Sequence, residues 1–402
     1  MKYIVVLGDG MADYEVEEFG GQTILDVAEK PNMDYMSKYG ELGLVKTVPD
    51  GLKPGSDVAN LSVMGYNTKE CYTGRSPLEA ASIGVDLSDD DITFRANLVT
   101  LSDEENYRDK TMIDYSAGEI TTAEAKELIE AVEEKLHTDV SHFFAGVSYR
   151  HLLVWKGGST KVNLTPPHDI SDRKVAEYLP KGENADKLLW FMTESEKILR
   201  EHPVNKKRIA EGKNPANSIW IWGEGSKPRL ESFTEKFGVK GSVISAVDLI
   251  KGIANCAKMN SIDVPGACGT YETNFDGKAE AALNTLLDGA DFVYIHMEAP
   301  DECGHQGDAV HKKLSVELID KKVVKFLKEE LTKRGIDYRM LILPDHPTPI
   351  KLKTHVSDPV PYILYDSTTE QGSNLEYNEK NAKKTGVYVS DGTDLMKKLL
   401  NR

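Results

Sequence analysis

The sequence predicts an α/β fold: a mainly parallel sheet flanked by helices, with a smaller α+β domain inserted into it. Three short apolar runs lead into polar segments that contain Gly or Pro. They are residues 3–7 (YIVVL), 292–297 (FVYIHM) and 339–343 (RMLIL). Such runs are typical of strands buried on both faces of a parallel sheet. Ligands bind open α/β sheets beyond the carboxyl ends of the strands, so we expect a site where these runs end.

A helical pattern connects the last two runs. Between residues 313 and 334, apolar residues recur every three or four positions, with lysines and glutamates between them. This spacing predicts an amphipathic helix that packs on the sheet. A further strand is expected at 362–365, so the C-terminal third should form one sheet with the N-terminal strand.

A chain of 402 residues suggests two or three domains. We interpret 92–215 as an inserted substrate-binding cap domain, and 1–91 with 216–402 as the catalytic domain, whose sheet resumes near SIWIWG at 218–223. Within the insert, Thr121 and Glu124 have the spacing of a capping box at a helix start. Strands are expected at 147–155 within the insert, and at 218–222 and 241–245 after it.

The composition limits the possible partners. The formal charge of -16 argues against non-specific binding to nucleic acid or to an anionic membrane, because both need a basic face. No apolar run approaches the length of a membrane-spanning helix. The four cysteines are scattered, which favours the reducing cytoplasm over a disulfide framework. Cys303 lies among the candidate ligands described next, but we interpret it as a small packed residue.

Candidate metal ligands are concentrated near the C-terminus. They are Asp301, His305, Asp345, His346 and His355. Imidazole and carboxylate groups bind zinc and manganese, whereas magnesium prefers oxygen ligands. Any one of these residues alone would more often be a turn, cap or solvated side chain. Because three predicted strand ends all deliver such groups, with Asp9 following the first strand, the sequence predicts a site for two metal ions.

Ser56 is the candidate nucleophile. It follows Pro-Gly in LKPGSDVANLSVMGY, at the expected start of a helix. Backbone N–H groups and the helix dipole favour negative charge there, and this would stabilise an alkoxide and then a phosphoserine. The alternative is a plain N-cap serine.

The ordered motifs GDG, PGSDVAN, DECGHQGD, PDH and HVSDPVP resemble those of the alkaline phosphatase superfamily. Within it, the chain is similar over nearly its whole length to the shorter, archaeal-type cofactor-independent phosphoglycerate mutases. TGRSPLEAASIGVDL, YRHLLVW, TPPHDI, WIWGEGSKP and SAVDLIKGIA also resemble segments of that group. The resemblance implies an alkaline-phosphatase-like core and interconversion of 2- and 3-phosphoglycerate without 2,3-bisphosphoglycerate, a step of glycolysis and gluconeogenesis.

The resemblance also implies two divalent ions, usually Mn²⁺, Mg²⁺ or Zn²⁺. Asp9, Ser56, Asp345 and His346 would hold one ion, and Asp301, His305 and His355 the other. Ser56 would be transiently phosphorylated. The longer bacterial mutases carry a GNSEVGH-like string at the nucleophile where this chain has GSDVANL, so their substrate contacts cannot be transferred.

The candidates for substrate contacts are arginines, histidines and polar residues near these motifs. They are Asp57, Asn60, Arg75, Arg150, His151, His168 and Arg173. The guanidinium fork suits both phosphate and carboxylate, whereas the alternative for each arginine is an ordinary salt bridge. His168, or Asp169 beside it, is the candidate general base, and the inserted domain is expected to close over the site.

Three other functions remain open at this point. A homoserine kinase could pass phosphate from ATP through Ser56, a metal-dependent phosphohydrolase would release free phosphate, and a non-catalytic protein would bind metal without forming a phosphoenzyme. The expected partner is a small phosphorylated molecule, and the expected assembly is a monomer or small homo-oligomer. The ligand types do not identify the physiological metal.

Overall fold

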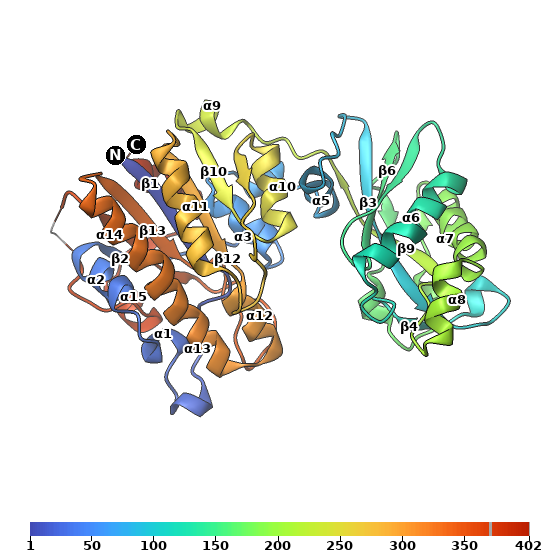
Figure 1. Ribbon diagram of the computed structural model, residues 1–402, viewed down its shortest axis with the longest axis horizontal. Helices are drawn as coiled ribbons and strands as arrows, with labels where there is room; N and C mark the ends of the chain where they lie inside the picture. Colours follow the sequence, from blue (N-terminus) through green and yellow to red (C-terminus); the bar gives the residue numbers. More distant parts are fainter. Residues whose placement is uncertain (370–371, 402) are drawn as a thin grey trace. The chain divides into compact units, whose positions relative to one another are not determined.

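The computed structural model describes residues 1–369 and 372–401. The chain forms two compact units (Figure 1). Met1–Tyr72 and Arg229–Arg402 make up the larger unit, and Thr73–Pro228 the smaller one. No helix in the described part has the length and apolarity needed to cross a bilayer, and no disulfide forms there.

The larger unit is built on an eight-stranded sheet, ordered β11-β10-β12-β1-β13-β14-β2-β15. At its centre, β1 (Lys2–Gly8) runs parallel to β12 (Phe292–Met297) on one side and to β13 (Tyr338–Leu343) on the other. β14 is antiparallel to both of its neighbours, while the other pairs are parallel. The remaining strands are β2 (Glu41–Val45), β10 (Gly241–Ile244), β11 (Asn260–Ile262), β14 (Val360–Asp366) and β15 (Tyr388–Val389). The predicted fold class and its three central strands are confirmed.

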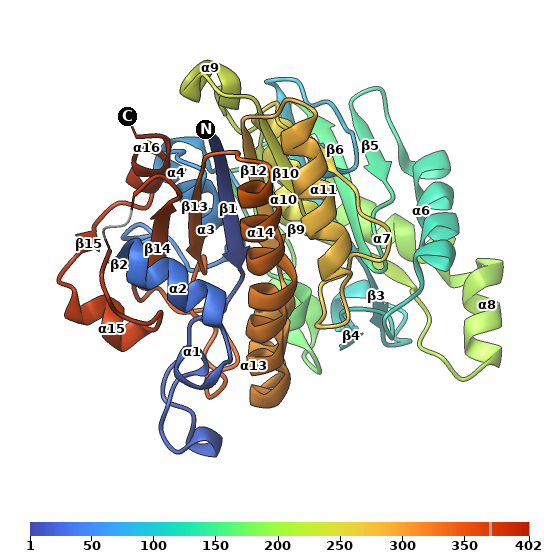
Figure 2. The ribbon, with the colours of Figure 1, turned by 60° about the vertical axis from the view of Figure 1, so that its left-hand side comes forward.

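Helices cover both faces of this sheet (Figures 1 and 2). One face packs against α2 (Pro31–Tyr39), α11 (Phe275–Leu287) and α14 (Lys325–Lys333); the other packs against α3 (Ser56–Val63), α10 (Asp248–Cys256) and α16 (Asp394–Leu400). Alternate residues of β12 serve the two faces. Val293, Ile295 and Met297 join the hydrophobic core beneath α11 and α14, and Tyr294 contacts α3 through Asn60.

The helix predicted at 313–334 is continuous but irregular. α13 (Ala309–Leu318) passes through a π-helical turn, Ile319–Val324, into α14. Asp320 in that turn accepts hydrogen bonds from the backbone N–H groups of Asn32 (3.0 Å) and Met33 (2.7 Å). The N-cap residue of α2, Lys30, makes no side-chain cap. Asp320 therefore supplies the capping acceptor for α2 from a distant part of the chain.

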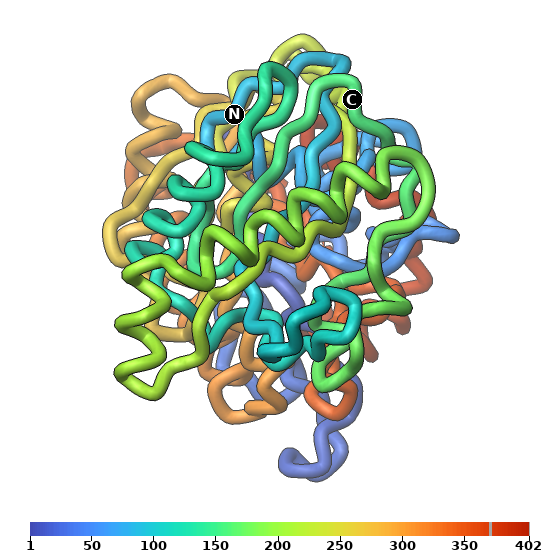
Figure 3. Tube along the Cα trace, turned by 90° about the vertical axis from the view of Figure 1, so that its right-hand side faces the viewer, coloured from blue at the N-terminus to red at the C-terminus, as the bar shows by residue number. Residues whose placement is uncertain are grey.

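The smaller unit has an antiparallel sheet in which β6 and β9 flank β3 (Asp91–Leu101). Its other strands are β4 (Met112–Asp114), β5 (Ser141–Phe144), β6 (Arg150–Lys156) and β9 (Ser218–Ser226). α6 (Thr122–Leu136) and α7 (Ala185–Arg200) lie side by side on one face of this sheet (Figure 3), followed by α8 (Pro203–Ala210). Thr121 and Glu124 form the predicted capping box of α6.

Short elements complete the two units. They are α1 (Ile24–Val27), α4 (Thr68–Cys71), α9 (Phe233–Phe237), α12 (Ala299–Gln306) and α15 (Glu379–Lys384) in the larger unit, and α5 (Ser76–Ser82), β7 (Val162–Asn163) and β8 (Lys181–Gly182) in the smaller one.

The prediction that the main sheet resumes at SIWIWG is wrong. This run is β9, which pairs with β3 in the smaller unit, with Ile221 opposite Ala96. α5 also belongs there, because the Ser76 hydroxyl bonds the Thr93 carbonyl and Ala80 packs against Leu152. The predicted boundaries at 92 and 215 therefore fall inside the smaller unit. A short apolar run has the same period in either sheet, so the sequence pattern does not show which sheet it joins.

We expect Asp320→Ala to destabilise the larger unit by about 1–3 kcal/mol, because the first N–H groups of α2 lose a buried acceptor. Chemical denaturation followed by circular dichroism would measure the change. Asp276→Ala is the control. It removes an exposed ion pair between α11 and Lys322 of the same π-helical turn, and it should change stability by less than about 0.5 kcal/mol. Equal effects of the two substitutions would contradict the capping role.

Candidate active site

The predicted site residues follow the carboxyl ends of three neighbouring strands. Asp9 follows β1, and Asp345 and His346 follow β13. α12 begins just after β12 and carries Asp301 and His305 four residues apart, so both lie on one helical face. The two glycines nearby, Gly304 and Gly307, would also allow a tight non-helical turn here, but the structure has the helix.

One group of candidate ligands surrounds Ser56. Ligand atoms of Asp9, Asp345 and His346 all lie within 4.8 Å of one another, and all three residues are buried. Ser56, the first residue of α3, places its Oγ 3.3 Å from Asp9 Oδ2 and 3.2 Å from His346 Nε2. The four residues that the sequence grouped around one ion thus converge.

A second group lies next to the first. Asp301 and His355 have ligand atoms within 4.8 Å of each other and of His346. The Nε2 atom of His305 is 2.9 Å from Nε2 of His355 and 3.2 Å from Oδ2 of Asp301. The predicted set of Asp301, His305 and His355 therefore also converges, and His346 belongs to both neighbourhoods.

The electrostatics of the site fit divalent cations. Burial, then the carboxylates of Asp345 and Asp301, raise the pKa of Asp9 well above its ordinary value. Its Oδ1 atom is buried and has no hydrogen-bond partner among the described residues. At 2.9 Å, only one hydrogen fits between the facing nitrogens of His305 and His355. A cation would stabilise the clustered carboxylates and accept both imidazole lone pairs, so the donor set suits Zn²⁺ or Mn²⁺.

The second group is strongly polarised. The hydrogen bond between His305 and Asp301 raises the pKa of His305 to about 9. Burial acts to raise the pKa of Asp301, but hydrogen bonds from His305 and His355 outweigh it, and this pKa lies well below its usual range. Burial lowers the pKa of His346, which keeps this imidazole neutral and able to act as a ligand.

Gly10 allows the loop after β1 to approach the ligands closely. Its φ is +61°, and a Cβ atom there would lie 2.6 Å from Asp301 Oδ1. Its N–H donates to Asp345 Oδ1 at 3.1 Å. Thr348 also connects the two groups, since its hydroxyl donates to Asp301 and lies 3.3 Å from His346 Nδ1. The GDG motif therefore needs its second glycine for close packing.

Two residues of the predicted nucleophile segment have structural partners instead of a surface for substrate. Asn60 is fully buried; its side-chain N–H groups donate to Asp345 Oδ2 (2.9 Å) and to the Ser56 carbonyl (2.8 Å). Its Oδ1 accepts from the Tyr294 hydroxyl at 2.6 Å. Asp57, the second residue of α3, accepts from the Val58 N–H and from the Tyr72 hydroxyl. The prediction that Asn60 contacts substrate is wrong, because its polar atoms are already used.

Sequence reasoning missed His296. This buried residue of β12 places Nε2 2.9 Å from Asp9 Oδ2. Burial lowers the pKa of His296 to about 3, so the neutral ring donates from Nε2 to the carboxylate. A signal was present: Tyr294 and His296 alternate with purely apolar residues in FVYIHM, and polar groups on one face of a buried strand need partners.

In the smaller unit, several predicted substrate residues join an aromatic–arginine cluster. Its members are Arg75, Arg95, Tyr115, Tyr149, Arg150, His168 and Trp222. The Arg95 guanidinium lies 4.3 Å over the Trp222 ring and donates to Glu79, which also pairs with Arg75. His168 contacts the rings of Trp222 and Tyr115, and Arg150 lies over Tyr149. Arg95 stands in no recognised motif, whereas Trp222 lies in WIWGEGSKP, a motif that was used for the family resemblance and not searched for site residues.

Of the two other candidates, His151 does not fit the prediction, and the role of Arg173 stays a prediction. His151 is buried, since it follows Arg150 on β6 and successive strand residues point to opposite faces. Its Nδ1 accepts from the Gly146 N–H, and burial lowers its pKa to about 3. Arg173 is exposed and bonds the Tyr178 hydroxyl at 3.3 Å. Asp169 lies 3.6 Å from His168 Nε2, within reach of this candidate base.

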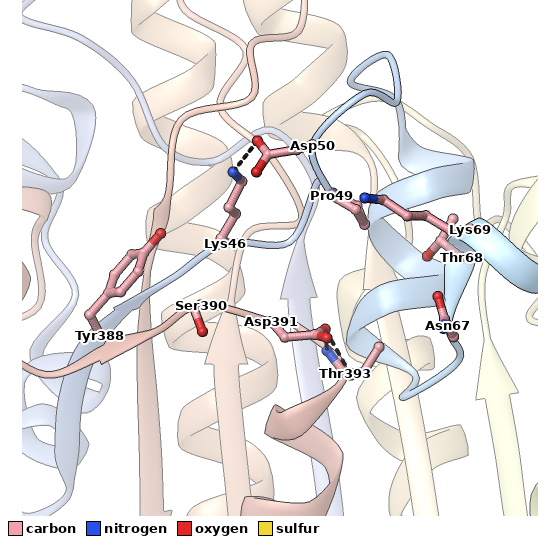
Figure 4. Close-up of a pocket in the computed structure, with 10 residues that line it drawn as sticks. All are labelled: Lys46, Pro49, Asp50, Asn67, Thr68, Lys69, Tyr388, Ser390, Asp391 and Thr393. Atoms are coloured by element: carbon pink, nitrogen blue, oxygen red, sulfur yellow. Dashed lines mark hydrogen bonds and ion pairs between the residues drawn. The ribbon is translucent and has the colours of Figure 1, made fainter.

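A separate polar pocket of about 420 Å³ lies in the larger unit (Figure 4). Its wall includes Lys46, Asp50, Lys69 and Asp391. Lys46 pairs with Asp50, and Asp391 accepts from the backbone and hydroxyl of Thr393. Two lysines face two aspartates, so the pocket offers no net charge to an anion, and we place the reaction at the ligand groups instead.

Comparisons with known proteins agree with this site. A sequence profile described as 2,3-bisphosphoglycerate-independent phosphoglycerate mutase matches residues 37–205. A Geobacter sulfurreducens protein named as a probable 2,3-bisphosphoglycerate-independent phosphoglycerate mutase is 50% identical over 403 residues, covering 100% of both chains. The chain belongs to this family. The Methanosarcina barkeri member is 47% identical, with 98% of each chain covered.

Solved structures support the same assignment. A Pyrococcus horikoshii protein aligns with a TM-score of 0.81 and 30% identity, covering 100% of this chain and 98% of that one. A cofactor-independent phosphoglycerate mutase from Thermoplasma acidophilum aligns with a TM-score of 0.67 and 25% identity, covering 100% and 99%. The resemblance to archaeal-type mutases inferred from motifs is therefore confirmed.

We expect Asp9→Asn to stabilise the metal-free mutase while weakening metal binding. Because the pKa of Asp9 is raised in the folded state, its ionisation destabilises the fold as pH rises above the ordinary carboxyl pKa, and the amide removes this cost. At pH 7 the melting temperature in chelator should rise by about 2 °C or more. The difference from wild type should shrink towards pH 4, and an unchanged or lower melting temperature at pH 7 would contradict the charge-repulsion account.

Proposed function

We propose that this chain interconverts 2- and 3-phosphoglycerate, without 2,3-bisphosphoglycerate, through a phosphoserine at Ser56 beside two divalent metal ions. The observation that carries the proposal is the position of Ser56 Oγ, 3.3 Å from Asp9 Oδ2 and 3.2 Å from His346 Nε2, at the first residue of a helix. A nucleophile thus lies among candidate ligands, at the end of a helix that favours anions.

In the proposed reaction, Ser56 Oγ attacks the phosphorus of the substrate. The bond from phosphorus to the glycerate oxygen breaks, and the departing glycerate oxygen takes up the proton that the Ser56 hydroxyl loses. The Ser56 hydroxyl proton is directed at Asp9 Oδ2, which receives it. The reverse attack by the other glycerate hydroxyl then returns the phosphoryl group to carbon 2 or 3 and restores Ser56.

Asp9, Ser56, Asp345 and His346 would hold one ion, and Asp301, His305 and His355 the other. Bound metal would neutralise phosphate oxygens and lower the pKa of the serine hydroxyl. The chain's own contribution is to hold Ser56 at the helix start and to keep the ligand carboxylates buried, where their charge is poorly screened by water.

We assign recognition of the glycerate carboxylate and phosphate to the aromatic–arginine cluster of the smaller unit, which thereby acts as the substrate-binding domain. Arg95 is held by Glu79 and by the Trp222 ring, so its guanidinium is oriented before substrate binds. Arg150 and His168 are exposed and complete the anion-binding set. Oriented guanidinium groups suit the paired oxygens of carboxylate and phosphate.

The purified protein loaded with Mn²⁺ or Mg²⁺ should convert 3-phosphoglycerate to 2-phosphoglycerate without added 2,3-bisphosphoglycerate, as measured by coupled enolase. Ser56→Ala should reduce turnover below about 10⁻⁴ of wild type, because the nucleophile is lost. Ser62→Ala, on the same helix, is the matched control and should retain activity, since the Ser62 hydroxyl has no partner among the described residues.

The same assay separates the competing functions. Formation of phosphohomoserine from ATP and homoserine, with no mutase activity, would identify a homoserine kinase. Rapid release of free phosphate would identify a phosphohydrolase. Metal binding without a phosphoenzyme or turnover would identify a non-catalytic protein. Full activity of Ser56→Ala would remove the proposed nucleophile.

Arg150→Met should raise KM for 3-phosphoglycerate about 10- to 100-fold, because a charged hydrogen bond to an anionic substrate is lost. Metal affinity and melting temperature should stay unchanged, since Arg150 is an exposed residue of the smaller unit. Arg200→Met, an exposed arginine on α7 that pairs with Glu196, is the control and should leave KM unaffected. Equal KM values for the two variants would exclude Arg150 from recognition.

A further inference from the structure

Strand β12 carries two fully buried polar side chains on one face. Tyr294 and His296 are separated by one residue, so both point to the α3 side of the sheet. Neither is a candidate metal ligand or touches Ser56 directly. Their partners are instead the carboxylate or amide groups that surround Ser56.

His296 is held in one orientation and bonds to Asp9. The Val247 N–H donates to Ser245 Oγ at 3.0 Å, which leaves the serine hydroxyl proton for Nδ1 of His296, 3.3 Å away. Nε2 then carries the ring proton and donates it to Asp9 Oδ2 at 2.9 Å. Lys278 donates to the His296 carbonyl at 3.0 Å and fixes the backbone at the same position.

Tyr294 is linked to the carboxylate of Asp345 indirectly, through the side chain of Asn60. Its hydroxyl donates to Asn60 Oδ1 at 2.6 Å, which fixes the orientation of the Asn60 amide. The amide N–H groups then face Asp345 Oδ2 at 2.9 Å and the Ser56 carbonyl at 2.8 Å. Reversing this amide would place its NH₂ group against the tyrosine hydroxyl and its oxygen against the carboxylate.

We propose that His296 and Tyr294 are positioning residues that orient Asp9 and Asp345, and so set the metal affinity of the Ser56-side group. This inference rests on the proposed metal-binding function. Hydrogen bonds to the side chains that bind a metal directly hold those side chains in orientation, and losing such a bond commonly weakens metal affinity about 10- to 100-fold. A buried central strand is a rigid support for such donors.

The second group should not depend on β12 side chains. Asp301 accepts one hydrogen bond from the Thr348 hydroxyl, and Nδ1 of His305 is 3.0 Å from the Lys353 carbonyl. These partners come from the segment that follows β13. Loss of His296 or Tyr294 should therefore weaken one metal site and spare the other, which a general loss of stability would not do.

Mn²⁺ titration by isothermal calorimetry tests the proposal. Wild type should bind two ions per chain. His296→Phe should weaken one of them about 10- to 100-fold and leave the other unchanged, and His296→Gln, which keeps a donor near the Nε2 position, should recover most of the loss. Tyr294→Phe should weaken the same ion. His355→Ala, combined with each variant, isolates the Ser56-side group.

Tyr377→Phe is the matched control, because Tyr377 is an equally buried tyrosine of the larger unit whose hydroxyl donates to the Pro361 carbonyl. It should leave both affinities unchanged. Unchanged binding in Tyr294→Phe and both His296 variants, or equal weakening of both ions, would overturn the positioning role. If wild type binds no Mn²⁺, the proposed metal function itself fails. Should His296→Phe not fold, Tyr294→Phe and His296→Gln decide the question.

Discussion

The structure of the site depends on one electrostatic constraint, the burial of Asp9, Asp301 and Asp345 at neighbouring strand ends. The sheet order places β1 between β12 and β13, so the segments that follow these strands meet at one edge. Burial penalises the charge of Asp9, and the nearby carboxylates of Asp345 and Asp301 add to that penalty. The fold therefore maintains an arrangement that is unfavourable by itself and favourable once positive charge is bound.

Because side chains alternate along β12, one face of this strand packs in the hydrophobic core and the other carries polar groups of the candidate site. Val293, Ile295 and Met297 contribute to the hydrophobic core, and the alternate residues Tyr294 and His296 lie on the face that carries Ser56 and Asn60. A register shift of one residue would exchange these sets and place polar groups in the core. Core packing thus maintains the geometry of the site.

Much of the candidate site was predictable from local sequence, because Asp9, Asp301 and Asp345 each come shortly after an apolar run. Asp9, Asp345 and His346 were placed correctly by the rule that strand ends bind ligands. The membership of β9 in the smaller sheet was not predictable, since strand pairing is a long-range property that a local pattern does not encode. The face occupied by His151 and the partners of Asn60 likewise depend on pairing and on contacts between distant segments.

In the proposed function the two units would make different contributions. The ligand groups of the larger unit are rich in carboxylate, so in the proposed function bound metal would supply the positive charge that an anionic substrate needs. Recognition of the rest of the substrate then requires guanidinium groups elsewhere in a chain of net charge -16. In the proposed function Arg95, anchored by Glu79 and stacked on Trp222, would meet this need at low entropic cost, because substrate binding would not have to immobilise it.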